Sequence, residues 1–135
     1  MTMATNKTLL TEAEVKAAID QLNSEYAHCI DDDRLEEWPD FFTDDCVYRV
    51  IGRDNYERNL PASLIFCNSK GMLKDRITAH RHANIYEKHV YRHLTSNTRI
   101  IGQEGGVYTT ETNYVVFQTR LEGDTEVYNA GKYID

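Results

Sequence analysis

The last third of the chain constrains the fold most, because residues 90–133 form a run rich in residues that favour β-strands. The run reads as three long strands rich in Tyr, Thr and Val. Two breaks, at residues 102–106 and 122–124, contain the glycines and acidic residues that favour tight turns. The pattern therefore predicts an antiparallel meander.

Large side chains occupy both faces of the predicted middle strand. One face carries Val107, Val115 and Phe117, and the other carries Tyr108, Tyr114 and Val116. Neither face is purely polar, as the solvent side of a half-buried sheet would be. The sheet is therefore expected to be covered on both sides, by helices on one side and by something else on the other.

A long amphipathic helix precedes the sheet. Residues 11–14 have the form of a capping box. Apolar residues then follow at helical spacing: Val15, Ala18, Ile19, Leu22, Tyr26, Cys29 and Ile30. The helix is expected to stop at the acidic triplet 31–33. A second, short helix is predicted after it, with Asp33 as its cap and with Leu35 and Trp38 buried before Pro39.

The middle of the chain carries weaker signals. Residues 46–51 alternate as a strand does, with Tyr48 and Val50 on one face, and residues 52–59 read as a polar loop. Pro61 suits a first helical turn, and the apolar residues from Leu64 to Ile77 support a helix that Gly71 weakens. Helices first and a meander afterwards predict an α+β fold, with the first helix in the concavity of a strongly curved sheet. One domain over residues 11–135, after a flexible tail at 1–10, is expected.

Composition excludes several classes of function. The 135 residues include 15 Lys and Arg against 22 Asp and Glu, and the resulting charge of −7 opposes binding to nucleic acid or to anionic membranes. The 3 cysteines form no CxxC pair, which fits a reducing cytoplasm. No run of about 18 apolar residues that could span a membrane is present, nor is a secretory signal.

Histidines concentrate in residues 75–93, which raises the question of a metal site. His89 and His93 are spaced as a helical ligand pair, but a strand over these residues would separate their Cα atoms by about 13 Å. A Rieske cluster needs paired Cys and His motifs, and no Cys here has a His two or three residues downstream. We therefore predict no metal ligands and no cofactor in this chain.

Acid–base catalysis is the alternative function that the residues leave open. Side chains of Tyr26, Asp31, Tyr48 and His93 could meet inside the fold, as a dehydratase or isomerase would require. The favoured interpretation is that the same tyrosines are core residues with satisfied hydroxyl groups and that Asp31 caps a helix. The main prediction is that the chain has no catalytic residues.

Arginines interleave with tyrosines in the same histidine-rich stretch, which is a composition typical of protein interfaces. The candidate contact residues are Arg76, Asn84, Tyr86, Tyr91, Arg92 and His93. The outer face of the sheet is a further candidate for contact between subunits.

Several motifs together resemble one family. They are Trp38-x-x-Phe41-Phe42-x-x-Asp45-x-x-Tyr48, Asp75-Arg76, the segments ANIY at 83–86 and YRH at 91–93, and the closing YNAGKYID at 128–135. The chain resembles the small (beta) subunit of bacterial aromatic-ring-hydroxylating dioxygenases, and within them those acting on aromatic acids such as terephthalate, anthranilate or salicylate.

The resemblance implies a cystatin-like cone of the kind seen in nuclear transport factor two. It also implies a large (alpha) subunit as partner, which holds the Rieske iron-sulfur cluster and the mononuclear iron. The small subunit is expected to self-associate as a trimer and to act as a noncatalytic structural component. Family members usually continue past the position of Asp135 with another strand, so the chain is expected to leave a strand edge unpaired.

Overall fold

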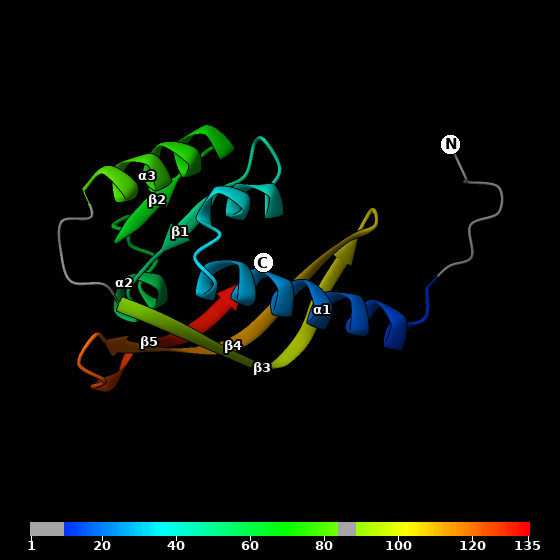
Figure 1. The fold of residues 1–135 in the computed structure, drawn as a ribbon. Coiled ribbons are helices and arrows are strands. Elements are labelled where there is room, and N and C mark those ends of the chain that lie inside the picture. Colours follow the sequence, from blue (N-terminus) through cyan, green and yellow to red (C-terminus); the bar gives the residue numbers. More distant parts are fainter. Residues whose placement is uncertain (1–9, 84–88) are drawn as a thin grey trace. The chain divides into compact units, whose positions relative to one another are not determined.

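The computed structural model describes residues 10–83 and 89–135, which fall into two compact units. The first unit comprises residues 10–32 and 89–135, and the second comprises residues 33–83. The first unit holds one helix and a three-stranded sheet, and the second holds short helices and a two-stranded sheet (Figure 1). The predicted α+β class is confirmed. That residues 11–135 act as a single domain stays a prediction.

Helix α1 (Glu12–Asp31) opens the first unit and begins where the capping box predicts. Thr11 accepts a hydrogen bond from the Glu14 N–H at 3.1 Å, and the Glu14 carboxylate accepts one from the Thr11 N–H at 3.4 Å. Both bonds satisfy donors that the first turn of a helix leaves unpaired. The helix buries Val15, Ala27 and Cys29.

The sheet of the first unit consists of β3 (His89–Glu104), β4 (Val107–Arg120) and β5 (Thr125–Ile134). The strands pair antiparallel in the order β3-β4-β5, which confirms the predicted meander. Gly105 and Gly106 in the first turn and Gly123 in the second have positive φ angles. Residues without a side chain adopt this conformation at little cost, which explains the glycines at both breaks.

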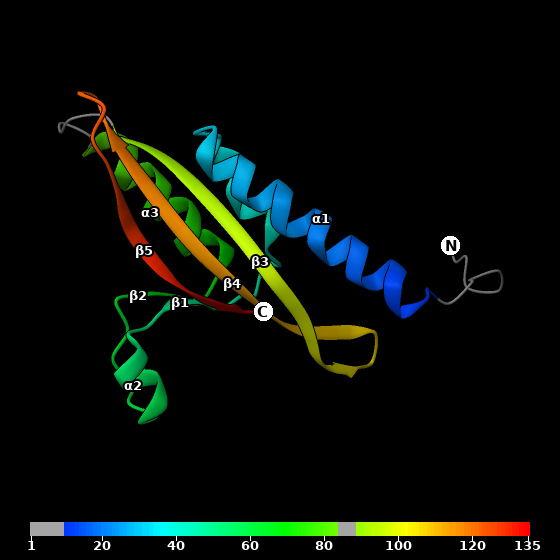
Figure 2. The same cartoon turned by 90° about the horizontal axis from the view of Figure 1, so that it is seen from below.

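Helix α1 runs along β3, as two perpendicular views show (Figures 1 and 2). The face of the sheet that it covers, here called the inner face, contains buried polar side chains, among them Thr112 and Gln118. Asn23 of α1 donates a hydrogen bond to the buried Thr112 hydroxyl at 3.1 Å, and Thr98 lies 2.9 Å from the same oxygen. Tyr26 packs edge-on against Tyr133 of β5, with ring centroids 6.0 Å apart. Hydrogen bonding therefore accompanies apolar contact where the helix meets the sheet.

Gly131 on β5 leaves room for close packing on the inner face. The Tyr114 ring stacks on Tyr133 with centroids 4.4 Å apart and passes over Gly131. A Cβ atom at Gly131 would lie 3.1 Å from atoms of the Tyr114 ring, which is tighter than ordinary carbon contacts. Burial also raises the pKa of the Tyr114 hydroxyl.

The second unit contains the 3₁₀ helix η2 (Leu35–Phe41), β1 (Tyr48–Val50), α2 (Arg53–Glu57), β2 (Ile65–Cys67) and α3 (Lys70–His82). Strands β1 and β2 pair antiparallel. Trp38 contacts Phe42 and Tyr48 edge-on, at centroid distances of 5.4 and 5.2 Å. Leu73 and Ile77 of α3 are buried. Aromatic rings and one helix face therefore make up the core of this unit.

Two predictions for the middle of the chain are wrong. Residues 52–59, predicted to be a loop, include α2, and the helix predicted from Pro61 onward begins only after Ser69. Ile65 pairs with Val50 instead, and the Leu64 N–H donates to the Val50 carbonyl at 2.7 Å. Strand pairing between distant residues overrides the local helical pattern here. Ser69 caps α3 through the Met72 N–H at 3.2 Å.

The short helix after α1 also differs from the prediction. Its N-cap position is Arg34, which makes no capping bond through its side chain, and the helix continues through Pro39 to Phe41. Asp33 is not a cap, because its backbone takes a φ of 60° and its carboxylate accepts hydrogen bonds from Arg81. The predicted strand over 46–51 is shorter, at Tyr48–Val50. None of the helices in the described part of the chain is long and apolar enough to span a membrane.

Candidate functional site

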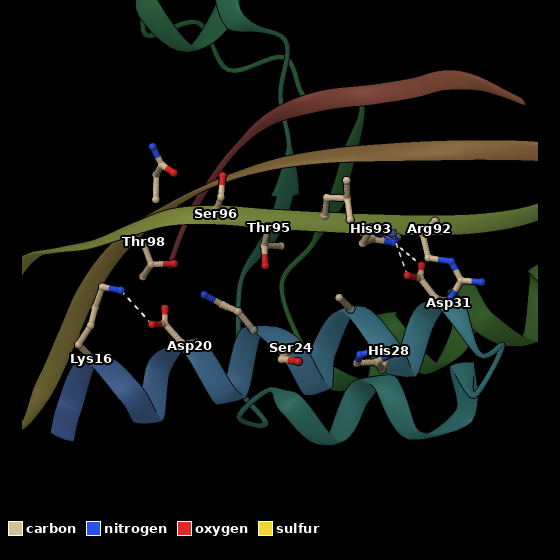
Figure 3. Close-up of a pocket in the computed structure, with 14 residues that line it drawn as sticks. Lys16, Asp20, Ser24, His28, Asp31, Arg92, His93, Thr95, Ser96 and Thr98 are labelled. Carbon is tan, nitrogen blue, oxygen red and sulfur yellow. Dashed lines mark hydrogen bonds and ion pairs between the residues drawn. The ribbon is translucent and has the colours of Figure 1, made fainter. Parts of the chain in front are cut away.

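The Asp31–His93 pair is the most buried contact between titratable side chains of the first unit. Asp31 ends α1, and His93 lies on the inner face of β3 (Figure 3). One carboxylate oxygen lies 2.5 Å from His93 Nδ1, and the other accepts the His93 backbone N–H at 2.8 Å. Their side chains are 3 % and 10 % exposed. Asp31 therefore holds both the ring and the backbone of one residue.

The position of His93 explains why this contact forms. Among the described strands, β3 lies at one edge of the sheet, so its outward N–H groups face no strand of this part of the chain. Asp31 satisfies one of these groups and, at the same time, joins the end of α1 to the strand. The pair therefore acts first as a structural clamp.

A polar groove extends from the clamp along α1 and β3. Its volume is about 550 Å³. The α1 side contributes Lys16, Asp20, Asn23, Ser24, Ala27, His28 and Asp31, and β3 contributes residues 92–98. Lys16 and Asp20 form an ion pair of 2.9 Å toward the end opposite the clamp (Figure 3). Most of the residues that line the groove have polar or charged side chains.

The structure brings two of the four alternative catalytic candidates into direct contact. Asp31 and His93 are in direct contact, and Nε2 is the ring nitrogen that remains for another group. Tyr26, in the same unit, packs edge-on against Tyr133. Tyr48 belongs to the second unit, where it packs against Trp38 and Phe42. An Asp–His pair can take part in proton transfer, but two residues alone define no reaction.

The candidate interface residues divide by exposure. Arg76 on α3 and Arg92 on β3 are exposed. Tyr91 faces inward, where its hydroxyl accepts a hydrogen bond from Gln118 at 3.3 Å, and His93 is held by Asp31. The other two candidates, Asn84 and Tyr86, lie outside the described residues. Among the four described candidates, the two arginines thus have the side chains that are open to a partner.

Metal ligation has no geometric basis in the described residues, where no three His, Cys, Asp or Glu side chains gather as a metal site needs. His89 and His93 lie on β3, as the strand prediction places them, and His80 and His82 lie in the last turn of α3. These histidines are therefore distributed over two elements of different units.

Sequence reasoning missed a carboxylate cluster around Arg81. The Arg81 guanidinium contacts both oxygens of Glu36 and both oxygens of Asp33 at 2.9 Å, and also donates to the Asp33 carbonyl. The hydrogen bond from Arg81, followed by a backbone hydrogen bond, lowers the pKa of Glu36 to about 2. Arg81 lies within the arginine-rich stretch 75–93, whose composition is typical of an interface, yet its bonds lie inside the second unit. The partners are 45 and 48 residues away, so no local pattern indicates them.

Comparison with known proteins identifies the class of the fold. A family model described as the SnoaL-like domain matches residues 11–135. The match covers the helix, the sheet and the intervening second unit, so the chain belongs to the SnoaL-like domain family.

Three relatives narrow the assignment. The anthranilate 1,2-dioxygenase small subunit of Burkholderia cepacia is 48 % identical over 84 % of this chain and 71 % of its own length. A terephthalate 1,2-dioxygenase oxygenase subunit beta of a Comamonas species is 39 % identical over 94 % of this chain and 80 % of its own. A solved structure from Novosphingobium aromaticivorans, described as the beta subunit of an aromatic-ring-hydroxylating dioxygenase, is 52 % identical with a TM-score of 0.85, covering 93 % of this chain and 80 % of that one. The chain belongs to the family of small (beta) subunits of aromatic-ring-hydroxylating dioxygenases.

Proposed function

We propose that this chain is the noncatalytic structural small subunit of a multicomponent dioxygenase that acts on an aromatic acid. The observation that carries the proposal is the 48 % identity to a dioxygenase small subunit over 84 % of the chain. The named relatives act on anthranilate and terephthalate, which are both aromatic rings bearing a carboxylate. This likeness favours the small-subunit function over the dehydratase alternative.

In this proposal the redox chemistry belongs to the large subunit, which would hold the Rieske cluster and the mononuclear iron. The most buried titratable pair of the first unit, Asp31 and His93, is engaged in holding α1 to β3. The Arg81 cluster is likewise engaged within the second unit. We interpret both groups as stabilising the fold, which fits a supporting subunit. Their contacts within the chain account for their positions without a bound substrate.

The proposed assembly has three parts. The chain binds its large subunit, associates with further copies of itself as a trimer, and works in the cytoplasm. Arg76, Arg92 and the outer face of the sheet are the proposed contact regions, because Arg combines a long apolar stem with planar hydrogen bonding.

Co-purification tests the proposal. The tagged chain is isolated from its native cell, and the eluate is analysed by mass spectrometry and for iron. We expect stoichiometric recovery of a larger, iron-bearing protein. Recovery of this chain alone, without iron, would contradict the small-subunit proposal and return attention to the Asp31–His93 pair.

Charge reversal at Arg92 tests the placement of the contact. Arg92→Glu is expected to weaken assembly by about 2–5 kcal/mol if a partner carboxylate is buried against it. Lys74→Glu, at an exposed position on α3, is the matched control and should leave assembly unchanged. Equal behaviour of the two variants would remove Arg92 from the interface.

A further inference from the structure

The outer face of the sheet, opposite α1, carries an apolar strip across all three strands. Two rows in register define it: Leu94, Val115 and Ala130, and next to them Arg92, Phe117 and Val127. Leu94 is 54 % exposed and Val127 is 58 % exposed. A contiguous apolar surface of this kind on a soluble chain commonly marks a protein contact.

Basic residues surround this strip, although the chain as a whole is acidic. Acidic residues outnumber basic ones in the first unit, whose basic residues are Lys16, Arg92, Arg99, Arg120 and Lys132. By strand register, Arg92, Arg99 and Lys132 belong to the outer face. Glu111 lies between two of them, 2.6 Å from Arg99 and 3.6 Å from Lys132. Glu104, opposite Val107, is a second acidic residue that the register places on this face. Basic residues therefore still outnumber acidic ones on the outer face, in a unit where acidic residues predominate.

The exposed side of helix α1 carries charge of the opposite sign. Its exposed side has Glu14, Ala18, Leu22 and Glu25 at helical spacing, here called the α1 stripe. Leu22 is 53 % exposed, which is high for a large apolar side chain. The stripe therefore combines carboxylates with apolar surface, as a complement to the outer face would.

The charges on the outer face and on the α1 stripe favour one of two possible contacts between copies of the chain. Contact of two outer faces about a twofold axis would place two surfaces with an excess of basic residues against each other, which like charges oppose. Contact of an outer face with an α1 stripe brings opposite charges and apolar surfaces together. Such a contact is head-to-tail, and it closes into a ring when the rotation between copies permits.

We propose that the outer face of one copy docks on the α1 stripe of a second copy. The proposal rests on the self-association included in the proposed function and assigns its two surfaces. The contact requires no metal, substrate or large subunit, so the isolated chain is expected to self-associate through it.

Two double variants test the contact by sedimentation velocity over a range of concentrations. The face variant Val127→Glu/Lys132→Glu makes the outer face acidic, and the stripe variant Leu22→Lys/Glu25→Lys makes the α1 stripe basic. Each variant alone is expected to lose at least about tenfold in self-association, because each brings like charges together. Lys74→Glu is the control, and far-UV circular dichroism verifies that the variants fold.

Mixing the two variants is the decisive step. In a head-to-tail contact the acidic face meets the basic stripe, and the basic face meets the acidic stripe, so association should return in the mixture. A stripe variant that associates as the parent chain does would overturn the proposal in favour of a face-to-face contact. A parent chain that stays monomeric would overturn it as well, while leaving recovery of the large subunit, and with it the proposed function, untouched.

Discussion

The two units of the chain differ in the length of their helices and strands. The first unit relies on long elements, with a helix of 20 residues and strands of 16, 14 and 10 residues. The second uses strands of 3 residues and helices of 5 to 13 residues, joined by side-chain contacts. Long elements repeat a pattern often enough for the sequence to reveal them, whereas short ones depend on the partners they meet.

The cores of the units differ in chemistry as well. Polar groups such as Thr112, Gln118 and the Asp31–His93 pair are buried in the first unit. In the second unit Trp38 and Leu73 form an apolar centre, and the Arg81 cluster lies nearer the surface. Loss of a buried apolar side chain should therefore affect the second unit most, and loss of a hydrogen-bonding partner the first.

Leu73→Ala should have the largest effect on stability. Leu73 is 0 % exposed, so truncation leaves a cavity and is expected to cost about 3–5 kcal/mol. Urea unfolding followed by fluorescence measures the loss, because the single tryptophan, Trp38, reports on the second unit. Lys74→Ala on the same helix should stay within about 0.5 kcal/mol of the parent. A similar cost for both variants would contradict the buried position of Leu73.

Asp31→Ala tests the polar core of the first unit. The substitution removes the acceptor of both the His93 ring and the His93 N–H, and should cost about 2–3 kcal/mol. Asp20→Ala is the control on the same helix, since its exposed pair with Lys16 contributes only about 0.5 kcal/mol. Chemical denaturation monitored by circular dichroism compares the two. If Asp31→Ala were as mild as the control, the clamp would not contribute to stability.

Gly131→Ala examines packing within the sheet. The new methyl group would press on the Tyr114 ring, which cannot shift freely because it stacks on Tyr133, so a cost of about 1–3 kcal/mol is expected. Gly102→Ala provides the comparison, because a Cβ atom there would meet its nearest neighbour at 3.8 Å. In thermal unfolding, the melting temperature of Gly131→Ala should be well below that of Gly102→Ala. The reverse order would argue against the stacked arrangement.

Glu36→Gln should have the smallest effect on the free energy of unfolding, and the size of this effect should depend on pH. Arg81 lowers the pKa of Glu36 from 4.5 to about 2 in the folded chain. A depressed folded pKa means that the stabilisation is fully present above pH 4.5 and is lost as the pH falls toward 2. The stability difference between the parent and Glu36→Gln should therefore shrink over that interval. Glu37→Gln is the neighbouring control, and a difference that grows in acid would contradict the role of Arg81.

Most of the first unit and the family could be predicted from sequence. The capping box located the start of α1, and alternation of β-forming residues located β3, β4 and β5 with their turns. The motifs around Trp38 and at the end of the chain indicated the small-subunit family, which the relatives confirm. Such signals are local or repeated, so they persist without knowledge of distant partners.

Only the tertiary structure decided the particular contacts. Asp31 meets His93 across 62 residues, and Arg81 meets Asp33 across 48. Ile65 joins a strand rather than a helix because Val50 lies opposite it. For the long elements of the first unit, the sequence alone determined which elements form, because periodicity and capping act within a few residues. Which side chains meet depended on how the folded backbone brings distant residues together, and no pattern of neighbours along the chain encodes that.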